Sequence, residues 1–426
     1  MARQSSQQPP QATPISARSI SQGVALLENL QQQRKVKRAR YSAVRRDEMD
    51  AEIESSAPVY DAFFQERGPQ GIHTMTNFSP SEINILWCDV RHFVMKHWNV
   101  VSGRKCTVSP RDLLFMLLTS MKHCGSWDVV GAVFQEKAPS FEKRIVKFLN
   151  TLHPHLVRKY VDDLSEKWTM QQLVAAGQQF ANHPFVRYAT DVTFQQTNVP
   201  AASFNEKKLY FSKKHSLYGH KVEVSVLPNG LAINCTCHYK GSVSDTIFDE
   251  NLDFHVNNLA KKPSELVMGD EGEDNDGRRA VEWAVIADKG YQGIQHAVRA
   301  VLPFKKPAGG VLTFDQERTN DRIATDRVIV ENWFERLKTL WGVCADSYRW
   351  NRQGYDVVFQ TCVALTNVHV RFNPLRASDG DANAKYLNRL DGIGSKMIKK
   401  KNASARTYRL KRKARLSLTL AAESAF

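Results

Sequence analysis

The chain has 426 residues, of which 42% are hydrophobic, and its formal net charge at pH 7 is +15. This length and apolar content are sufficient for a sizeable core and favour two or three domains. The positive charge indicates a polyanionic partner, most simply nucleic acid, although an acidic membrane surface would attract the chain as well.

Two classes of protein are disfavoured at once. No apolar run approaches the length of a membrane span, and residues 1–33 are rich in Gln, Ser and Pro and lack the apolar core of a secretory signal. The seven cysteines include no CxxC pair. Cys235 and Cys237 follow an alternating pattern, which places two thiols on one face as packed side chains or, alternatively, as ligands. We expect a reduced, intracellular, soluble protein with no membrane partner.

Both ends of the chain are basic. Residues 1–57 contain few large apolar groups, and residues 34–40 and 399–415 are rich in Lys and Arg. We therefore expect a disordered N-terminal arm and a disordered basic tail over residues 376–426. Each basic stretch is a nuclear import signal, a phosphate-binding segment or, in the simplest alternative, a solubilising tail. A nuclear location is expected on this basis.

Residues 78–165 show helical patterns. Apolar helices are expected over residues 111–118 and 127–134, and a break precedes a third helix over residues 141–149, whose apolar positions follow helical spacing. Two short helices joined by a tight break, the second one basic, resemble a helix-turn-helix unit. Its predicted DNA-binding residues are Lys143, Arg144 and Lys147. Helices that pack together without any role in DNA binding would show the same pattern.

From residue 183 the pattern changes to strands. The first strand is expected over residues 185–194, and residues 220–226 and 231–237 form an antiparallel hairpin, because apolar groups alternate on both arms. The acidic stretch near residues 263–278 is interpreted as a solvated loop rather than a metal site, because it lacks apolar groups to hold the carboxylates in place.

Further elements are expected at residues 283–288 (strand), 295–299 (helix), 300–304 (short strand) and about 321–341 (long helix). This is the element order of a ribonuclease-H-like core, in which helices flank a mixed sheet. We therefore predict an α/β catalytic domain over residues 183–375, preceded by the all-α, helix-turn-helix-like domain over residues 78–165.

Three carboxylates occupy the positions at which such a core carries metal ligands. Asp191 lies within an apolar strand, Asp288 ends another strand, and Glu331 lies on the final helix. An ionised carboxylate in or at the end of a hydrophobic strand is costly unless something pairs with it, and a bound cation can pair with several carboxylates at once. Asp191, Asp288 and Glu331 are therefore the predicted catalytic and metal-binding residues.

The final helix carries two stripes at helical spacing. The apolar stripe, which is expected to pack on the sheet, consists of Val330, Phe334, Leu337 and Trp341. The charged stripe consists of Arg327, Glu331, Glu335 and Lys338. Glu331 and Glu335 repel each other, and either a metal ion or the two cations of the stripe would compensate for this repulsion.

Phosphodiester chemistry explains why acids would be gathered in this way. Two ions about 3.5 to 4 Å apart can activate a nucleophile and neutralise charge on the attacking and leaving oxygens. Mg²⁺ and Mn²⁺ prefer oxygen ligands, so the predicted cofactor is one of these metals, as a pair of ions. The 13 histidines show no zinc-hydrolase spacing such as HExxH. A glycosidase would use two carboxylates, but it gives no reason for the third acid or the basic ends.

These residues resemble those of the DDE superfamily endonucleases, transposases related to PIF/Harbinger elements, over roughly residues 80–375. The most specific stretches are Ala189-Thr-Asp191-Val-Thr, Gly241-Ser-Val-Ser-Asp245, Ala287-Asp288-Lys-Gly-Tyr-Gln-Gly293 and Val330-Glu331-Asn-Trp-Phe-Glu-Arg-Leu-Lys338. Arg327, Glu331 and Lys338 also match a Tyr-x2-Arg-x3-Glu-x6-Lys signature, in which Ala324 replaces the tyrosine. Asp245 resembles a supporting acid of the family, and helix capping is the simpler explanation for it.

The resemblance implies metal-dependent cleavage of DNA at transposon ends, followed by transfer of the freed 3′-hydroxyl to target DNA. Backbone phosphates would be contacted by Lys289, Arg327, Arg336 and Lys338. A homo-oligomer, at least a dimer, is implied as well, together with a Myb-like DNA-binding helper, in which case residues 110–150 would pack or dimerise instead of reading bases. The alternative is a transposase-derived protein that binds DNA or a partner and no longer cuts.

Overall fold

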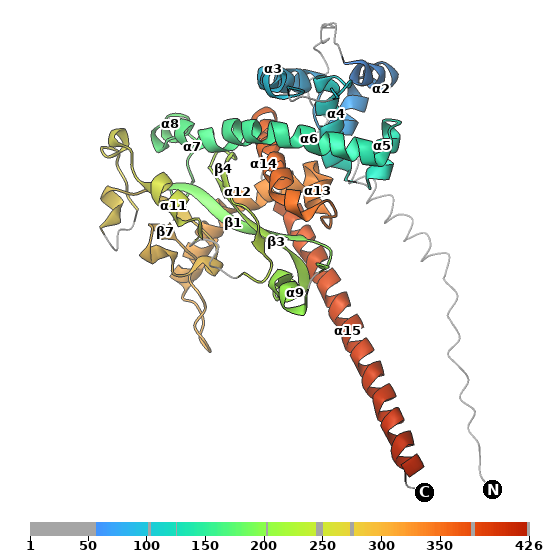
Figure 1. Cartoon of the computed structure of the whole chain (residues 1–426). Coiled ribbons are helices and arrows are strands. Elements are labelled where there is room, and N and C mark those ends of the chain that lie inside the picture. Colours follow the sequence, from blue (N-terminus) through green and yellow to red (C-terminus); the bar gives the residue numbers. More distant parts are fainter. Residues whose placement is uncertain are drawn as a thin grey trace, which may run out of the picture. The chain divides into compact units, whose positions relative to one another are not determined.

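The computed structural model describes residues 57–423, except for residues 101–103, 125, 202, 244–249, 273–276 and 376–379. The described residues belong to one compact unit, whose elements are labelled in Figure 1. The predicted N-terminal arm therefore lies outside the described residues except for Ala57, and Asp245 lies outside them as well.

Helices make up the first described part of the chain. They are α2 (Pro58–Thr76), α3 (Pro80–His97), α4 (Pro110–His123), α5 (Trp127–Val133), α6 (Ala138–Val157), a π-helical turn (Arg158–Asp162), α7 (Asp163–Lys167) and α8 (Met170–Ala175). Ser79, Ser109 and Ser126 each accept a hydrogen bond from a backbone N–H in the first turn of the following helix, which explains why α3, α4 and α5 begin where they do.

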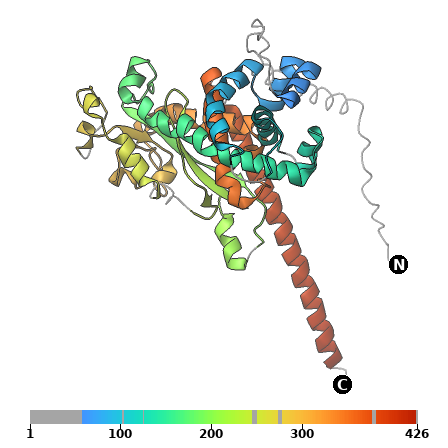
Figure 2. The same ribbon diagram turned by 45° about the horizontal axis from the view of Figure 1, so that its top comes forward.

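Helix α6 is longer than the predicted segment 141–149, because it extends from Ala138 to Val157. Its predicted apolar face is confirmed, since Phe141, Ile145, Phe148 and Leu149 are all buried. This face packs against α3, α4, α5 and α14 (Tyr355–Phe372), and Figures 1 and 2 show α6 lying across α14. Buried side chains of the helical segment and of the sheet belong to one hydrophobic cluster.

A mixed sheet forms the other half of the core. Its strands are β1 (Val186–Gln196), β2 (Phe211–Ser212), β3 (Leu217–Val226), β4 (Ala232–Cys235), β5 (Tyr239–Lys240), β6 (Ala284–Ile286) and β7 (Ala300–Val301). The order is β2-β3-β1-β6-β7, with β4 and β5 also paired to β3. Strand β3 is antiparallel to β1 and β4, whereas β6 is parallel to β1 and β7. The predicted hairpin and the predicted ribonuclease-H-like arrangement are thus confirmed.

Helices cover both faces of this sheet. On one face, α12 (Phe314–Leu340) packs against β1 and β3, and the short helix α13 (Gly342–Ala345) follows it. On the other face lies α11 (Leu252–Leu259), whose Leu259 belongs to a second buried cluster together with Tyr188 and Val285. The short helix α9 (Phe204–Tyr210) contacts β3. The apolar stripe predicted for the final helix is confirmed, because Val330, Phe334, Leu337 and Trp341 are all buried.

Other predicted boundaries also differ from the structure, three of them near the end of the sheet and in the final helix. Helix α12 begins at Phe314 instead of residue 321, because Thr313 and Gln316 form a reciprocal capping box. The helix predicted over residues 295–299 is only a 3-10 turn, Ile294–His296, next to another, Lys289–Tyr291. The short strand predicted over residues 300–304 ends at Val301.

The acidic loop is not uniformly solvated, so that prediction is wrong for two of its acids. Asp270 is buried and accepts hydrogen bonds from Arg299 Nη1 at 2.6 Å and from Lys261 Nζ at 3.1 Å. Glu265 is fully buried and accepts one from Trp283 Nε1 at 2.9 Å. Basic and aromatic side chains outside the acidic stretch hold these carboxylates, which is why the composition of the loop alone did not reveal them.

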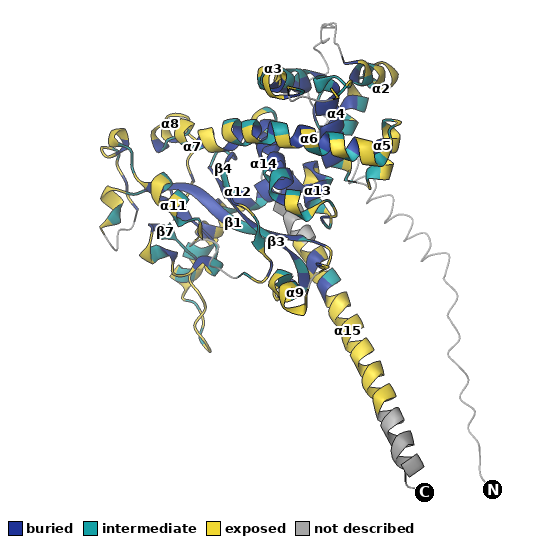
Figure 3. Cartoon of the chain, in the orientation of Figure 1, coloured by how far each residue is buried: buried dark blue, intermediate teal, exposed yellow. Residues whose placement is uncertain are grey.

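The C-terminal segment is also more ordered than predicted. Gly380–Glu423 forms one helix, α15, instead of a disordered tail, and Figure 3 shows that most of its described length is exposed. Among the described residues, no helix is both long enough and apolar enough to cross a membrane.

Candidate active site

The sheet register brings Asp191 and Asp288 side by side. Strands β1 and β6 are parallel, with Ala189 paired to Ile286, so Asp191 and Asp288 each follow a paired position by two residues. Neighbouring strands lie about 4.8 Å apart, and side chains two residues apart point to the same face. Ala189 and Ile286 pack in the cluster on the α12 side of the sheet, and both acids therefore belong to that face.

Helix α12 adds the third acid to this face together with a cation. Arg327 lies one helical turn before Glu331 and bridges two of the acids: its Nη1 donates to Asp191 Oδ2 at 3.1 Å, and its Nη2 donates to Glu331 Oε1 at 2.6 Å. The side chains of Asp191, Arg327 and Glu331 are 23%, 17% and 32% exposed. The cluster is therefore enclosed but still open to solvent.

The negative charge of the three acids in this cluster exceeds the positive charge of Arg327. Burial raises the pKa of Asp191 to about 6; Arg327 and the Val192 N–H oppose this rise, while Asp288 and Glu331 reinforce it. Burial of Arg327 favours its neutral form, but Asp191, Glu331 and Asp288 outweigh that effect and raise its pKa. One guanidinium thus leaves negative charge uncompensated among three neighbouring carboxylates.

The residues after Asp288 are anchored on the opposite face of the sheet. Asp288 Oδ1 accepts the backbone N–H of Lys289 at 2.7 Å, and Tyr291 Oη donates to Glu223 Oε2 at 2.9 Å. Glu223 is fully buried on β3, where it pairs in register with Val192, the neighbour of Asp191. Its carboxylate therefore links the segment that follows Asp288 to β3, the strand paired with the Asp191 strand.

Three more side chains, from Tyr188, Asn251 and His255, extend this network around Glu223. His255 Nε2 lies 3.0 Å from Glu223 Oε1, and Asn251 Nδ2 donates to the same oxygen at 2.7 Å. The Tyr188 hydroxyl lies 2.9 Å from His255 Nδ1. The sequence analysis missed Glu223, although a charged residue amid alternating apolar positions of a strand was a usable signal.

Two of the four predicted phosphate contacts are wrong for this structure. Arg336 is 1% exposed, and its Nη1 donates to the Asn373 carbonyl at 2.6 Å, so it joins α12 to the end of α14. Lys338 is buried, and its pKa is lowered to about 7 by burial, against the opposing effect of Glu335 and Asp191. Both side chains lie in the part of α12 that is covered all round. Lys289 is exposed, and Arg327 binds the acids.

The basic residues of α6 do not behave alike. Lys143 and Lys147 are exposed and line an open pocket of about 580 Å³. Arg144 forms an ion pair with Glu136, and DNA contact by Arg144 stays a prediction. Reading of DNA by Lys143 and Lys147 stays a prediction.

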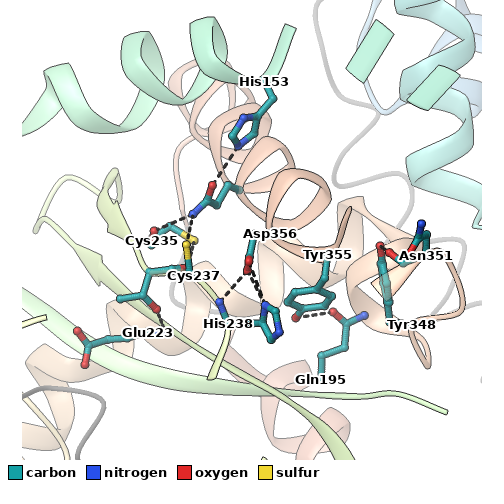
Figure 4. Close-up of polar contacts among 12 residues, drawn as sticks. His153, Gln195, Glu223, Cys235, Cys237, His238, Tyr348, Asn351, Tyr355 and Asp356 are labelled. Atoms are coloured by element: carbon teal, nitrogen blue, oxygen red, sulfur yellow. Dashed lines mark hydrogen bonds and ion pairs between the residues drawn. The ribbon is translucent and has the colours of Figure 1, made fainter. Parts of the chain in front are cut away.

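A polar cluster fastens the end of the β3–β4 region to α14 (Figure 4). The backbone N–H of His238 donates to Asp356 Oδ1 at 2.7 Å, and His238 Nδ1 lies 2.9 Å from the same oxygen. Gln360 Nε2 donates to the Cys235 carbonyl at 3.4 Å. Cys235 and Cys237 are free thiols, and burial raises the pKa of both. Protonated thiols are poor metal ligands. Cys235 is half-buried, as expected for a packed thiol, whereas Cys237 is exposed.

The three acids suit a divalent metal by their chemistry. Within the part of the chain that the structure describes, no three His, Cys, Asp or Glu side chains are arranged as a metal-binding group. Arg327 forms ion pairs with both Asp191 and Glu331. The oxygen donors, the partial exposure and the uncompensated negative charge nevertheless fit Mg²⁺ or Mn²⁺. A metal ion would take over the charge that Arg327 neutralises only in part.

Comparisons with known proteins agree with this geometry. The family described as DDE superfamily endonuclease matches residues 190–367, a range that contains Asp191, Asp288 and Glu331. A curated protein of Microchaete diplosiphon, "Probable transposase for insertion sequence element IS702", is 28% identical over 160 residues, which cover 37% of this chain and 48% of that protein. The chain thus matches about half the length of this relative. No solved structure matches the chain. Taken with the sheet order, these matches show that the chain is related to the DDE transposases.

Proposed function

We propose that this protein is an active DDE transposase that cleaves DNA at the ends of a transposable element. The observation that carries the proposal is the convergence of Asp191, Asp288 and Glu331 on one face of the sheet, with more negative charge than Arg327 compensates. The three carboxylates would hold two divalent ions. Bound Mg²⁺ or Mn²⁺ supplies an activated nucleophile and neutralises charge on the scissile phosphate.

The reaction follows from phosphodiester chemistry. In the cleavage step, a water oxygen forms a bond to phosphorus, the bond from phosphorus to the 3′ oxygen breaks, and that oxygen leaves as a 3′-hydroxyl. In the transfer step, the freed 3′ oxygen forms a bond to a phosphorus of the target DNA, and a 3′ oxygen of the target leaves. Arg327 holds one oxygen of Asp191 and one of Glu331, and it would compete with a bound metal for these two carboxylates. Lys289 is exposed next to Asp288 and is placed to contact a backbone phosphate.

Several wider properties belong to the same proposal. A paired complex of two element ends requires at least a dimer, a Myb-like helper would supply sequence recognition, and the basic stretches would direct the protein to the nucleus. PIF/Harbinger elements are the proposed subgroup, on the strength of the motifs around Asp191, Asp288 and Glu331.

Calorimetry with Mn²⁺ and a plasmid cleavage assay test the proposal together. Asp288→Asn should abolish cleavage and leave DNA affinity nearly unchanged, and the double variant Asp191→Asn/Asp288→Asn should lose Mn²⁺ binding. Asp315→Asn, an exposed acid in the first turn of the same α12 helix, is the matched control and should behave as the native chain. Cleavage by Asp288→Asn at the native rate would remove Asp288 from the mechanism. Absence of Mn²⁺ binding by the native chain, with and without DNA, would favour a transposase-derived protein that does not cut.

A further inference from the structure

Helix α15 is anchored to the core near its beginning. Leu390 is 1% exposed and packs with Phe194 and Leu217. Gly394 lies so close to the backbone of His215 that a Cβ on it would be 2.0 Å from the His215 carbonyl oxygen. Arg389 Nη2 donates to the Ala345 carbonyl at 2.9 Å. These contacts fix where the helix leaves the protein.

Beyond this anchor the helix is exposed on every side. Residues 395–412 are all exposed, which Figure 3 shows as a continuous exposed helix. Among these 18 residues there are no Asp or Glu, and the basic ones are Lys396, Lys399, Lys400, Lys401, Arg406, Arg409, Lys411 and Arg412. Eight cations without an intervening acid repel one another along a helix, so a polyanion would relieve an existing cost.

The distribution of these cations around the helix decides which polyanion fits. At about 100° per residue, Lys396 and Lys400 lie on one side, Lys399 and Arg406 on a second, and Lys401 and Arg412 lie roughly opposite the second pair. A helix that rests on a membrane surface separates a charged face from an apolar one, and this segment does not. The exposed apolar residues Met397, Ile398, Tyr408 and Leu410 do not follow a heptad, which disfavours a coiled coil with a second copy.

We propose that residues 395–412 of α15 bind duplex DNA as a helix lying in the major groove, where phosphates flank it on both sides. The major groove is about 12 Å wide and admits an α-helix of about 10–12 Å diameter, whereas the minor groove, at about 6 Å, does not. The segment is about 27 Å long, at 1.5 Å per residue, so it extends over less than one turn of duplex, about 34 Å. The inference rests on the proposed function only in taking DNA as the partner, and it assigns a binding surface outside the acidic cluster.

A variant that keeps every charge but breaks the helix distinguishes binding by a helix in the groove from binding by an unstructured cationic tail. Ala405→Pro breaks the exposed helix in its middle at a position far from the anchor, and Ala405→Ser is its matched control. Fluorescence anisotropy with the full chain, a labelled 20-base-pair duplex and no divalent metal should show a loss of at least tenfold in affinity for Ala405→Pro and native affinity for Ala405→Ser. Native affinity for Ala405→Pro would overturn the proposal in favour of an unstructured cationic tail.

A charge series tests the phosphate contacts. The triple variant Arg406→Gln/Arg409→Gln/Arg412→Gln should reduce the slope of log affinity against log salt by about 2 to 3, since each phosphate contact contributes about 0.9. The control, Arg91→Gln/Lys96→Gln/Lys167→Gln, removes three exposed charges elsewhere and should leave the slope nearly unchanged. Equal slopes for the two triple variants would refute the surface, and so would unchanged binding to a duplex methylated at guanine N7, which lies in the major groove.

Failure of this inference differs from failure of the proposed function. If the native chain binds no duplex even at low salt, the proposed function falls as well. If it binds and cleaves duplex DNA and the α15 variants match it, only the α15 surface is refuted. Loss of binding to anionic phospholipid vesicles in the triple variant, with DNA binding unchanged, would identify a membrane surface instead.

Discussion

Replacing Asp191 with asparagine is expected to stabilise the metal-free protein at neutral pH. The pKa of this carboxyl is raised from 3.8 to about 6, because burial outweighs the attraction of Arg327. Folding therefore favours the protonated form, and the ionised form that is present at pH 7 opposes folding. At about 1.4 kcal/mol per pKa unit, this rise in pKa means that the ionised Asp191 lowers the free energy of unfolding at pH 7 by about 3 kcal/mol.

The sign of this effect gives a distinctive pH dependence. Between pH 6 and pH 4 the folded chain binds a proton at Asp191 that the unfolded chain does not bind, so the native protein gains stability as the pH falls through this range. Asp191→Asn lacks the titrating group. The stability difference between the two proteins should therefore narrow by about 2.4 kcal/mol between pH 7 and pH 4, because the unfolded carboxyl is already partly protonated at pH 4.

Urea denaturation at pH 7 and pH 4, with metal removed by a chelator, measures this difference. Asp326→Asn is the control, because Asp326 is a buried acid of the same helix that accepts hydrogen bonds from Asn182 and lies 2.8 Å from His183 Nδ1; its replacement should destabilise the protein at pH 7. Lower stability of Asp191→Asn than of the native chain at pH 7, or an equal stability difference at both pH values, would contradict a raised pKa of Asp191. Mn²⁺ at 100 times its dissociation constant should stabilise the native chain alone, by about 2.7 kcal/mol.

Three further substitutions probe other parts of the site. Arg336→Gln should lower the free energy of unfolding by about 1–3 kcal/mol, because it leaves the Asn373 carbonyl without its donor; native DNA affinity of the folded variant in anisotropy would confirm that Arg336 does not contact DNA. Tyr291→Phe should reduce the single-turnover cleavage rate more than DNA affinity, since it releases the segment after Asp288 from Glu223; a variant that cleaves at the native rate would exclude this positioning role. Arg327→Gln should tighten Mn²⁺ binding in calorimetry, because it removes the cation that occupies Asp191 and Glu331; weaker binding would mean that Arg327 helps to hold the metal site together.

The acids could be located from the sequence because their surroundings were local. Asp191 lies within one short apolar run and Asp288 ends another, and an acid in such a run stands out whatever the fold. The hairpin of β3 and β4 could also be predicted from the sequence. Apolar residues alternate along both strands, and alternate residues of a strand face the same side of a sheet. The contact between Arg327 and Asp191 could not be predicted from the sequence, because it joins positions 136 residues apart.

The starts of helices were predicted correctly where the N-terminal capping residue was identified in the sequence, and incorrectly where it was not. Ser109 and Ser126 were sufficient for α4 and α5. The Thr313 and Gln316 capping box was present in the sequence, yet the helical pattern alone placed the start of α12 seven residues late. The crossover from β6 to β7 contains only 3-10 turns, and a few helix-forming residues there were not enough for a full helix.

The predicted DNA contacts on α12 show that helical periodicity in the sequence does not reveal whether a charged residue is exposed. A helix on a surface has one buried stripe, and charges elsewhere on it are expected to face solvent. From Asn332 to Lys338, however, every residue of α12 is buried, because the sheet covers one side of the helix and α14 packs against it as well. The apolar stripe was therefore correct, whereas the inference that Arg336 and Lys338 are free for DNA was not. Basic residues that bind DNA are better predicted on segments that no other element covers, such as the exposed residues 395–412 of α15.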